Sequence, residues 1–416
     1  MQFRQLGARL LAAASTAALS LLILSCGASN TIDFLYVTSN LQSPGQINVY
    51  EVNSESGALF QIPDSPYPSG GRNPVYEVAT PNGLNLFVAN HDDNSIVLFA
   101  IGTDGKLYPL QTVTTPGTEP VAIALNPSGT ALYVLDYYAP AAPGQPSFTD
   151  LNPGPGALIV YPITPGPSGL SSLGSPLTVG AANYFPVQCF PSNLTVTPNG
   201  NFVYVTNTNA VVVTTSPPVT GTVPTLPASC PSSGTVSAFS ISSSALTQVS
   251  GSPFSTGAGS EPTGILADPG NGSIYVTDTL LNKLYTFSIQ SSGALSLAST
   301  VATGTMPMGG TIVDSKFLYV TNYTDGSISI YSLSSGLPSL VTTSNAGSSG
   351  PLCVIADPNT QRFLYTADYI GGTVGGAELD PSTGTIITNQ GSPYVTSGQP
   401  TCVAAITHPG GNKNGL

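Results

Sequence analysis

Three ionisable residues beside predicted loops or at the start of predicted strands are the first candidates for chemistry: Arg72, Glu77 and His91. A histidine exchanges protons near neutral pH, so His91 is a candidate general base. A guanidinium can hold a carboxylate or phosphate through two hydrogen bonds, which makes Arg72 a candidate anion clamp. A rim ion pair is the alternative for Arg72, and a solvated loop is the alternative for His91. These three residues form the candidate catalytic set.

His91 is followed directly by two carboxylates, Asp92 and Asp93. A carboxylate that meets a histidine orients its ring and stabilises its protonated form. Adjacent residues in a loop are expected to point in different directions, and the second histidine, His408, belongs to the opposite end of its strand. Asp92 and Asp93 are therefore binding candidates, without a prediction that either contacts His91.

Several tyrosines follow predicted strands and are candidates for ligand contacts. An aromatic ring with a hydroxyl group suits a carbohydrate or an aromatic ligand. Tyrosine is also a favoured strand residue, which is the structural alternative. The candidates are Tyr137, Tyr138, Tyr323 and Tyr369.

A polar side chain recurs at the end of one repeated phrase. Hard oxygen ligands around an axis would suit Ca²⁺. The alternative is that each side chain caps its own turn, and sevenfold recurrence favours this structural role. We predict no cofactor, with Ca²⁺ as the open alternative. The residues are Ser39, Asn90, Asp136, Asn207, Asp278, Asn322 and Asp368.

The phrase itself returns seven times along the chain. Examples are Val203-Tyr-Val-Thr-Asn207 and Leu318-Tyr-Val-Thr-Asn322, each followed by a polar loop and a second alternating stretch. Seven copies of a strand-rich unit predict radial repetition. We therefore expect an all-β, seven-bladed β-propeller with four antiparallel strands in each blade.

The ends of the chain predict how the ring closes. The first phrase has no inner strand before it, and residues 400–409 form a strand with no continuation. We expect this C-terminal strand to complete the N-terminal blade and remove both free edges. Tight turns such as Thr80-Pro-Asn-Gly83 make one face uniform. The other face carries insertions at 138–156 and 208–234, so it is the predicted binding face.

The start of the chain has the composition of an export signal. Arg4 and Arg9 precede an apolar run over residues 10–24, which is too short to span a bilayer. The run ends in Ser25-Cys26-Gly27, which resembles a bacterial lipobox with Cys26 as the lipidation site. An ordinary signal peptide is the alternative. We expect an exported protein, anchored in the outer membrane or at the cell surface, with a leader 1–25, a lipidated tether 26–32, a propeller 33–410 and a tail 411–416.

The acidic composition limits the partners. The chain has 20 Asp and Glu against 8 Lys and Arg, a net charge of −12, and two of these cations lie in the leader. Nucleic acids and anionic lipid surfaces attract clustered cations. We therefore expect no nucleic-acid partner. We expect a monomer that contacts the membrane through its anchor, with an envelope protein or a glycan as candidate partner.

Four further cysteines would lie in an oxidising compartment, where an even number suggests disulfides. Cys189 lies just before an inner strand and Cys230 in a long loop of the same blade, which predicts one bridge. Cys353 and Cys402 hold equivalent places in neighbouring inner strands. They are a second candidate pair, which requires that the two inner strands approach to the usual Cα separation of about 4.4–6.8 Å. Buried free thiols are the alternative.

The Tyr-Val-Thr-Asn phrases, inner strands such as Pro400-Thr-Cys-Val-Ala404 and the Pro-Asn-Gly turns resemble the lactonase-type seven-bladed propellers. These include 6-phosphogluconolactonases and the fungal carboxymuconate-lactonising enzymes, and the resemblance covers residues 31–410. It implies lactone chemistry by His, Arg and Glu around the channel mouth, often just after the inner-strand proline. Two positions beyond that proline this chain has neither Arg nor His, but Tyr76, Ala122, Asn193, Gly264, Gly309, Cys353 and Cys402.

Because those charged residues are missing, the sequence favours a non-enzymatic binding module that uses the loop-rich face. The alternative is a lactone hydrolase with Arg72, Glu77 and His91 at the channel mouth. A hydrolase should bring charged side chains together there, whereas a binding module should present small and apolar ones.

Overall fold

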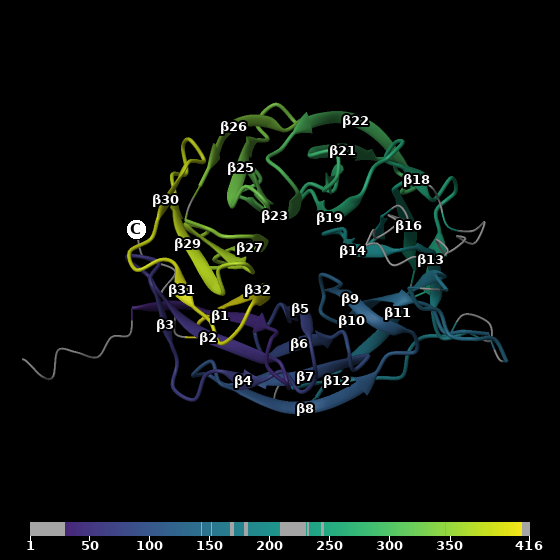
Figure 1. Ribbon diagram of the computed structural model, residues 1–416, viewed down its shortest axis with the longest axis horizontal. Coiled ribbons are helices and arrows are strands. Elements are labelled where there is room, and N and C mark those ends of the chain that lie inside the picture. Colours follow the sequence, from purple (N-terminus) through teal and green to yellow (C-terminus); the bar gives the residue numbers. More distant parts are fainter. Residues whose placement is uncertain are drawn as a thin grey trace, which may run out of the picture.

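Seven antiparallel sheets form a ring around a central channel, and each sheet is one blade of a β-propeller (Figure 1). The computed structural model describes residues 30–142, 144–150, 152–166, 170–178, 182–208, 230, 233–242, 245–345 and 347–409. The predicted leader, Cys26, most of the 208–234 insertion and the tail lie outside these residues. No helix long and apolar enough to span a membrane occurs in the described part of the chain. The predicted seven-bladed, all-β fold is confirmed.

The first four blades contain strands β1 to β18 together with β32, and in each blade the strands follow one another from the channel outward. Blade 1 consists of β32 (Pro400–Thr407), β1 (Thr31–Ser39), β2 (Gln46–Asn53) and β3 (Leu59–Gln61), with β4 (Tyr67–Pro68) beside β2. Blade 2 consists of β5 (Pro74–Ala79), β6 (Asn85–Asn90), β7 (Ser95–Ile101) and β8 (Leu107–Thr114). Blade 3 consists of β9 (Thr118–Leu125), β10 (Ala131–Tyr138), β11 (Pro155–Pro165) and β12 (Ser171–Leu173), with β13 (Phe185–Cys189) beside β11. Blade 4 consists of β14 (Pro191–Val196), β15 (Phe202–Asn207), β16 (Thr235–Ser242) and β17 (Ala245–Gln248), with β18 (Phe254–Ser255) beside β16.

The last three blades repeat the same order. Blade 5 consists of β19 (Pro262–Ala267), β20 (Ser273–Asp278), β21 (Lys283–Ile289) and β22 (Leu295–Ala302). Blade 6 consists of β23 (Pro307–Val313), β24 (Phe317–Asn322), β25 (Ser327–Ser332) and β26 (Ser339–Ser344). Blade 7 consists of β27 (Pro351–Ala356), β28 (Phe363–Asp368), β29 (Thr373–Leu379) and β30 (Ile386–Thr388), with β31 (Tyr394–Val395) beside β29.

The two ends of the propeller meet in blade 1. Strand β32 pairs antiparallel with β1, in a register that runs from Asp33 opposite Thr407 to Ser39 opposite Pro400. In Figure 1 the yellow C-terminal strand lies beside the purple N-terminal one. The predicted ring closure is therefore confirmed, and β1 has no free edge toward the channel.

The second strand of each blade carries the repeated phrase, and its side chains are buried on both faces. In β6, β24 and β28 every residue is buried. This burial is possible because each blade packs on a neighbour at both faces, and one hydrophobic cluster fills each space between blades. The phrase therefore reads as a nearly continuous apolar run, as strands buried on both faces do.

The tyrosine of the phrase connects its blade to the next one. Its hydroxyl donates to the carbonyl of a glycine in the turn between the third and fourth strands of the following blade. Four such bonds occur: Tyr36 to Gly105 at 3.1 Å, Tyr204 to Gly293 at 3.0 Å, Tyr319 to Gly384 at 2.8 Å and Tyr365 to Gly57 at 2.8 Å. Gly384 shows why the turn needs glycine, since its φ is +74° and a Cβ there would overlap the Phe317 ring.

The threonine of the phrase forms a second connection, close to the channel. The Thr277 hydroxyl donates to the Met308 carbonyl of the next inner strand at 2.7 Å, and the Thr321 hydroxyl donates to Leu352 at 3.3 Å. These bonds to a neighbouring blade explain why Tyr and Thr recur together.

Candidate functional site

Two residues from each blade surround the channel at its loop-rich end, and we call them the mouth ring. One residue comes immediately before the inner-strand proline, and the other comes immediately after the end of the phrase. The first set is Asn73, Glu119, Phe190, Glu261, Met306, Gly350 and Gln399; the second set is Asn40, His91, Tyr137, Thr208, Thr279, Tyr323 and Tyr369.

A backbone hydrogen bond joins the two members of the ring in most blades. The N–H of His91 donates to the Asn73 carbonyl at 3.0 Å, and the N–H of Tyr323 donates to the Met306 carbonyl at 2.9 Å. Asn73, Glu119, Phe190 and Met306 all have positive φ, between 50° and 59°. Left-handed backbone is costly for residues other than glycine and gathers at functional sites. Left-handed residues also occur in the turns of the opposite face, for example Asp314 and Gln361, so it is the charged side chains described next that make the mouth the candidate site.

His91 is held by its chain neighbour on the blade 2 side of the mouth. Its Nδ1 lies 2.8 Å from Asp92 Oδ1, so the two adjacent side chains do meet, contrary to the expectation for a loop. This hydrogen bond lowers the pKa of Asp92. Nε2 of the same ring faces Glu119 Oε2 of blade 3 at 3.9 Å. His91 is thus oriented as a histidine base is, with one nitrogen bound to a carboxylate and the other accessible.

Glu119 completes this cluster from the next blade. Its backbone N–H donates to Asn94 Oδ1 at 2.7 Å, which holds the residue in its left-handed conformation. Partial burial raises the pKa of Glu119, and the proximity of His91 opposes this shift. Glu119 is a charged residue directly before an inner-strand proline, and this position is the signal in the sequence that points to it.

Arg72 holds the loop that carries Asp92 and Asp93, and it is not among the residues that line the channel. Its Nε and Nη2 lie 2.7 and 2.6 Å from Asp93 Oδ1, and Nη2 also donates to the Asp92 carbonyl at 3.1 Å. The guanidinium is therefore engaged in a rim ion pair, which is the alternative to the anion clamp that the sequence offered for Arg72. Asn73 adds a bond from Nδ2 to Asp92 Oδ1 at 3.1 Å, so the loop that carries Asp92 is fixed from both sides.

Glu77, the third catalytic candidate, is buried between blades 1 and 2. Thr38 donates to its carboxyl group from the hydroxyl at 2.5 Å and from the backbone N–H at 3.2 Å. Burial raises the pKa of Glu77 to about 8. Glu77 therefore takes the place of a main-chain carbonyl as the acceptor for the phrase threonine, and it belongs to the lining of the channel.

The paired tyrosines of blade 3 have different roles. Tyr138 is buried, and its hydroxyl donates to Asp150 at 2.8 Å, so this binding candidate is part of the scaffold. Tyr137 packs edge-on against Tyr138 and Phe190 in the mouth ring. Burial raises the pKa of Tyr137 to about 12, with smaller effects from Asp150 and Glu119. Tyr137 is therefore a neutral hydrogen-bond donor near Glu119.

The other two candidate tyrosines lie together on blades 6 and 7. Tyr323 and Tyr369 line one small pocket at the mouth, together with Met306, Met308 and Leu352. The mouth thus has a charged side, formed by blades 2 and 3, and an apolar side, formed by blades 6 and 7.

Below the mouth, the channel is a cavity of about 760 Å³ lined by inner-strand side chains. Tyr76 lines it together with Asn193, Cys353 and Cys402, and burial raises the pKa of the Tyr76 hydroxyl. Among the described residues that line the channel there is no lysine, arginine or histidine. The side chains two positions beyond the inner-strand proline therefore form an uncharged part of the channel lining below the mouth.

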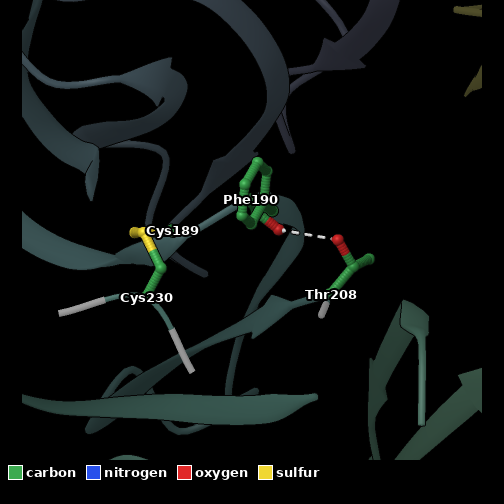
Figure 2. Close-up of a disulfide and its surroundings, with 4 residues drawn as sticks. All are labelled: Cys189, Phe190, Thr208 and Cys230. Carbon is green, nitrogen blue, oxygen red and sulfur yellow. Dashed lines mark hydrogen bonds between the residues drawn. A yellow bond between two sulfur atoms is a disulfide. The ribbon is translucent and has the colours of Figure 1, made fainter. Parts of the chain in front are cut away.

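The predicted bridge between Cys189 and Cys230 is present, with a Cα separation of 5.2 Å. It attaches the blade 4 loop to the segment that leads into the mouth ring, where the Thr208 hydroxyl donates to the Phe190 carbonyl (Figure 2). Cys353 and Cys402 are free thiols, with their sulfurs 2.7 Å apart. The structure thus has the free-thiol alternative for this pair, and both side chains line the channel close together.

Most of the polar residues at the phrase ends form hydrogen bonds with their own blade or the loop leading into it, whereas the carboxyl group of Asp368 is buried without a hydrogen-bond partner among the described residues. Asp278 Oδ1 accepts from the backbone N–H groups of Leu280 and Leu281, and Asn207 Nδ2 donates to the Ser237 hydroxyl. Within the described ranges, no group of three or more His, Cys, Asp or Glu side chains is placed to hold a metal ion. These contacts favour the structural role over the Ca²⁺ alternative.

Residues 28–138 and 273–400 match the family of seven-bladed β-propellers described as lactonase. The chain belongs to this family. No curated protein matches it in sequence. Among solved structures, a periplasmic gluconolactonase of Pseudomonas aeruginosa is 18% identical, with a TM-score of 0.69 over 91% of this chain and 100% of the other. A candidate 6-phosphogluconolactonase of Bacteroides fragilis is also 18% identical, with a TM-score of 0.68 over 91% of this chain and 99% of the other.

These two solved structures share the fold of the whole propeller. Membership in the family, together with the charged cluster at the mouth, favours the lactone-hydrolase alternative over the binding module. The charged residues were not found two positions beyond the proline because they come from the loops above it.

Proposed function

We propose that this protein hydrolyses small uncharged lactones at the channel mouth. The observation that carries this proposal is the orientation of His91, whose Nδ1 is bonded to Asp92 while Nε2 faces Glu119 across 3.9 Å. A general base needs a fixed ring and an accessible nitrogen, and His91 has both.

In the proposed reaction, Asp92 accepts the Nδ1–H hydrogen bond and leaves the Nε2 lone pair free. Nε2 removes a proton from a water molecule, and the oxygen of that water attacks the lactone carbonyl carbon. The tetrahedral oxyanion then collapses and breaks the bond between the acyl carbon and the ring oxygen. The ring oxygen takes the proton back from the imidazolium, and the product is a hydroxy acid.

Two further side chains would support these steps. Tyr137 stays protonated because its pKa is raised to about 12, so it can donate a hydrogen bond to the oxyanion. Glu119 would position the water and stabilise the imidazolium. Neither role requires a metal ion or an organic cofactor.

The charge of the channel supports an uncharged substrate. The lining residues include no cationic side chain among those the structure describes, and the nearby Arg72 is already paired with Asp93. A phosphorylated or carboxylated lactone would meet no counter-ion there and would lose its hydration without compensation.

We also propose that the protein acts outside the cytoplasm, anchored through Cys26. The sequence of the leader supports export, and the Cys189–Cys230 disulfide supports an oxidising compartment. Radiolabelled palmitate should enter the full chain and be absent from Cys26→Ala.

A substrate survey tests the hydrolase proposal. Purified protein is incubated with unsubstituted γ- and δ-lactones, with gluconolactone and with a phosphorylated gluconolactone, and the release of acid is followed. We expect turnover of the uncharged lactones at a kcat/KM about 100-fold above that of the phosphorylated one. Absence of turnover for every lactone would contradict the proposal and leave the non-enzymatic binding module as the better account.

A further inference from the structure

A second, smaller pocket opens beside the channel between blades 6 and 7. Its volume is about 200 Å³, and it is lined by Met306, Met308, Tyr323, Leu352 and Tyr369. Met306 and Tyr323 belong to the mouth ring of blade 6, and Tyr369 belongs to that of blade 7. Met308 is in β23 and Leu352 is in β27.

This pocket adjoins the channel. Met308 and Leu352 line both cavities, so they form the wall that the two share. A ligand at the mouth can therefore place one part in the channel opening and another part in the side pocket. A pocket of about 200 Å³ is smaller than a typical ligand site of about 300–1,000 Å³, so it fits one substituent of a ligand.

The lining of the pocket is chemically uniform. It contains two thioethers, one aliphatic side chain and two aromatic rings, and no charged side chain. Neither the Tyr323 nor the Tyr369 hydroxyl donates to a partner among the described residues, whereas the buried Tyr319 and Tyr365 hydroxyls each bond to a glycine carbonyl. Thioethers and ring faces adapt to apolar groups of different shape.

The backbone around the pocket is held in place. Met306 has a φ of 59°, its N–H donates to Asn282 Oδ1 at 2.8 Å, and its carbonyl accepts from Tyr323. Asn282 of blade 5 thus accepts a hydrogen bond from the backbone N–H of Met306, as Asn94 of blade 2 does from that of Glu119. The same type of asparagine–backbone hydrogen bond therefore positions Glu119 on the charged side of the mouth and the partly exposed Met306 on the apolar side.

We propose that this pocket is the subsite for an apolar substituent of the substrate, namely an alkyl or aryl group carried by an uncharged lactone. The inference rests on the proposed hydrolase function and names its substrate class. Blades 6 and 7 lie across the channel from blades 2 and 3 (Figure 1). A lactone ring at His91 must therefore extend its substituent across the mouth, which selects a chain of several carbons over a methyl group.

A chain-length series tests the subsite. The kcat/KM of the purified full-length protein is measured for δ-lactones with no side chain and with methyl, pentyl and nonyl side chains. We expect little difference between the first two, and then a gain of about 3-fold for each methylene that enters the pocket. A kcat/KM that does not rise with chain length would overturn the inference while leaving hydrolysis intact.

Two variants locate the effect. Met306→Gln makes the pocket polar at a partly exposed position, and we expect it to lower the ratio of kcat/KM for the pentyl lactone to that for the unsubstituted lactone by about 10-fold. Leu340→Gln removes a similarly exposed apolar side chain from the outer strand β26 and should keep that ratio. An unchanged ratio in Met306→Gln, in a protein that melts like the parent, would contradict the assignment.

Equilibrium binding separates this inference from the proposed reaction. The probe is 2-pentyltetrahydropyran, a cyclic ether that cannot be hydrolysed, and binding is measured by calorimetry. If no lactone is turned over, saturable binding that Met306→Gln weakens would still support the subsite and refute only the hydrolase. Failure of the ether to bind, with or without turnover, would overturn the subsite.

Discussion

The Nδ1 atom of His91 lies 2.8 Å from the Oδ1 atom of Asp92, the next residue in the chain. Two adjacent residues meet here because the loop is fixed from outside: Arg72 holds Asp93, and Asn73 holds Asp92. Asn73 also has a positive φ, and its carbonyl accepts a hydrogen bond from the His91 N–H, which fixes the backbone of the loop. This local order gives the only histidine of the mouth ring a defined orientation.

Replacing Asp92 should impair the reaction without unfolding the protein. Asp92→Asn keeps the size of the side chain but removes the charge that fixes the tautomer of His91, so we expect kcat/KM to fall by about 100-fold or more. Asp325 is the matched control, because it occupies the place of Asp93 in blade 6 and accepts from the Thr305 N–H. An equal loss in Asp325→Asn would mean that the loops matter only for architecture.

Stability should fall as the pH rises from about 5 to 8. Burial raises the pKa of Glu77 to about 8 and that of Asp136 and Asp368 to about 7. In the unfolded chain these groups ionise near pH 4, so between pH 4 and 8 the unfolded state binds fewer protons than the folded state, which favours unfolding as pH rises. Thermal melts across this range should show a falling Tm, with a smaller decline for Glu77→Gln. A Tm that rises across this window would contradict the assignment.

The tyrosine connection between blades can be measured at one position. Tyr319→Phe removes the bond to the Gly384 carbonyl, and we expect it to lower the free energy of unfolding by about 1 kcal/mol. Tyr275 is in the same position of the phrase in blade 5, and its hydroxyl forms no such bond to the described part of the chain, so Tyr275→Phe serves as the control. Equal losses in denaturant titrations would show that ring packing, and not the bond, stabilises the blade interface.

The free thiols of Cys353 and Cys402 should form a disulfide under oxidising conditions. Their sulfurs are 2.7 Å apart, and the bridge would join the inner strands of blades 7 and 1. After treatment with oxidised glutathione, we expect no titratable thiol in the unfolded propeller, whereas Cys353→Ser should keep one. Two thiols that remain reactive after oxidation would exclude the bridge.

The repeats predicted the blades and the ring closure because both depend on local, periodic features. The phrase, its turns and the unpaired end strands each follow from side-chain alternation and turn chemistry. The mouth was harder to predict, since its geometry depends on contacts between blades. Glu119 and Met306 take their places from Asn94 and Asn282 of preceding blades, and no local pattern reports such a bond.

Two questions that the sequence left open have the same physical answer. The sequence did not decide whether Cys353 and Cys402 lie close enough for a bridge, and their sulfurs are 2.7 Å apart. For Arg72 it left both an anion clamp and a rim ion pair open, and Asp93 of the next loop takes its guanidinium to the rim. In both cases the arrangement of neighbouring strands and loops decides where a side chain lies.

The most direct test of the proposed function is the kcat/KM for hydrolysis of an uncharged δ-lactone by the parent protein and by His91→Ala, with the Tm of each recorded. The account predicts that kcat/KM falls by at least about 100-fold in the variant, because the general base is lost, while the Tm is kept. A variant that hydrolyses the lactone within roughly twofold of the parent would contradict the assignment of His91 as the base.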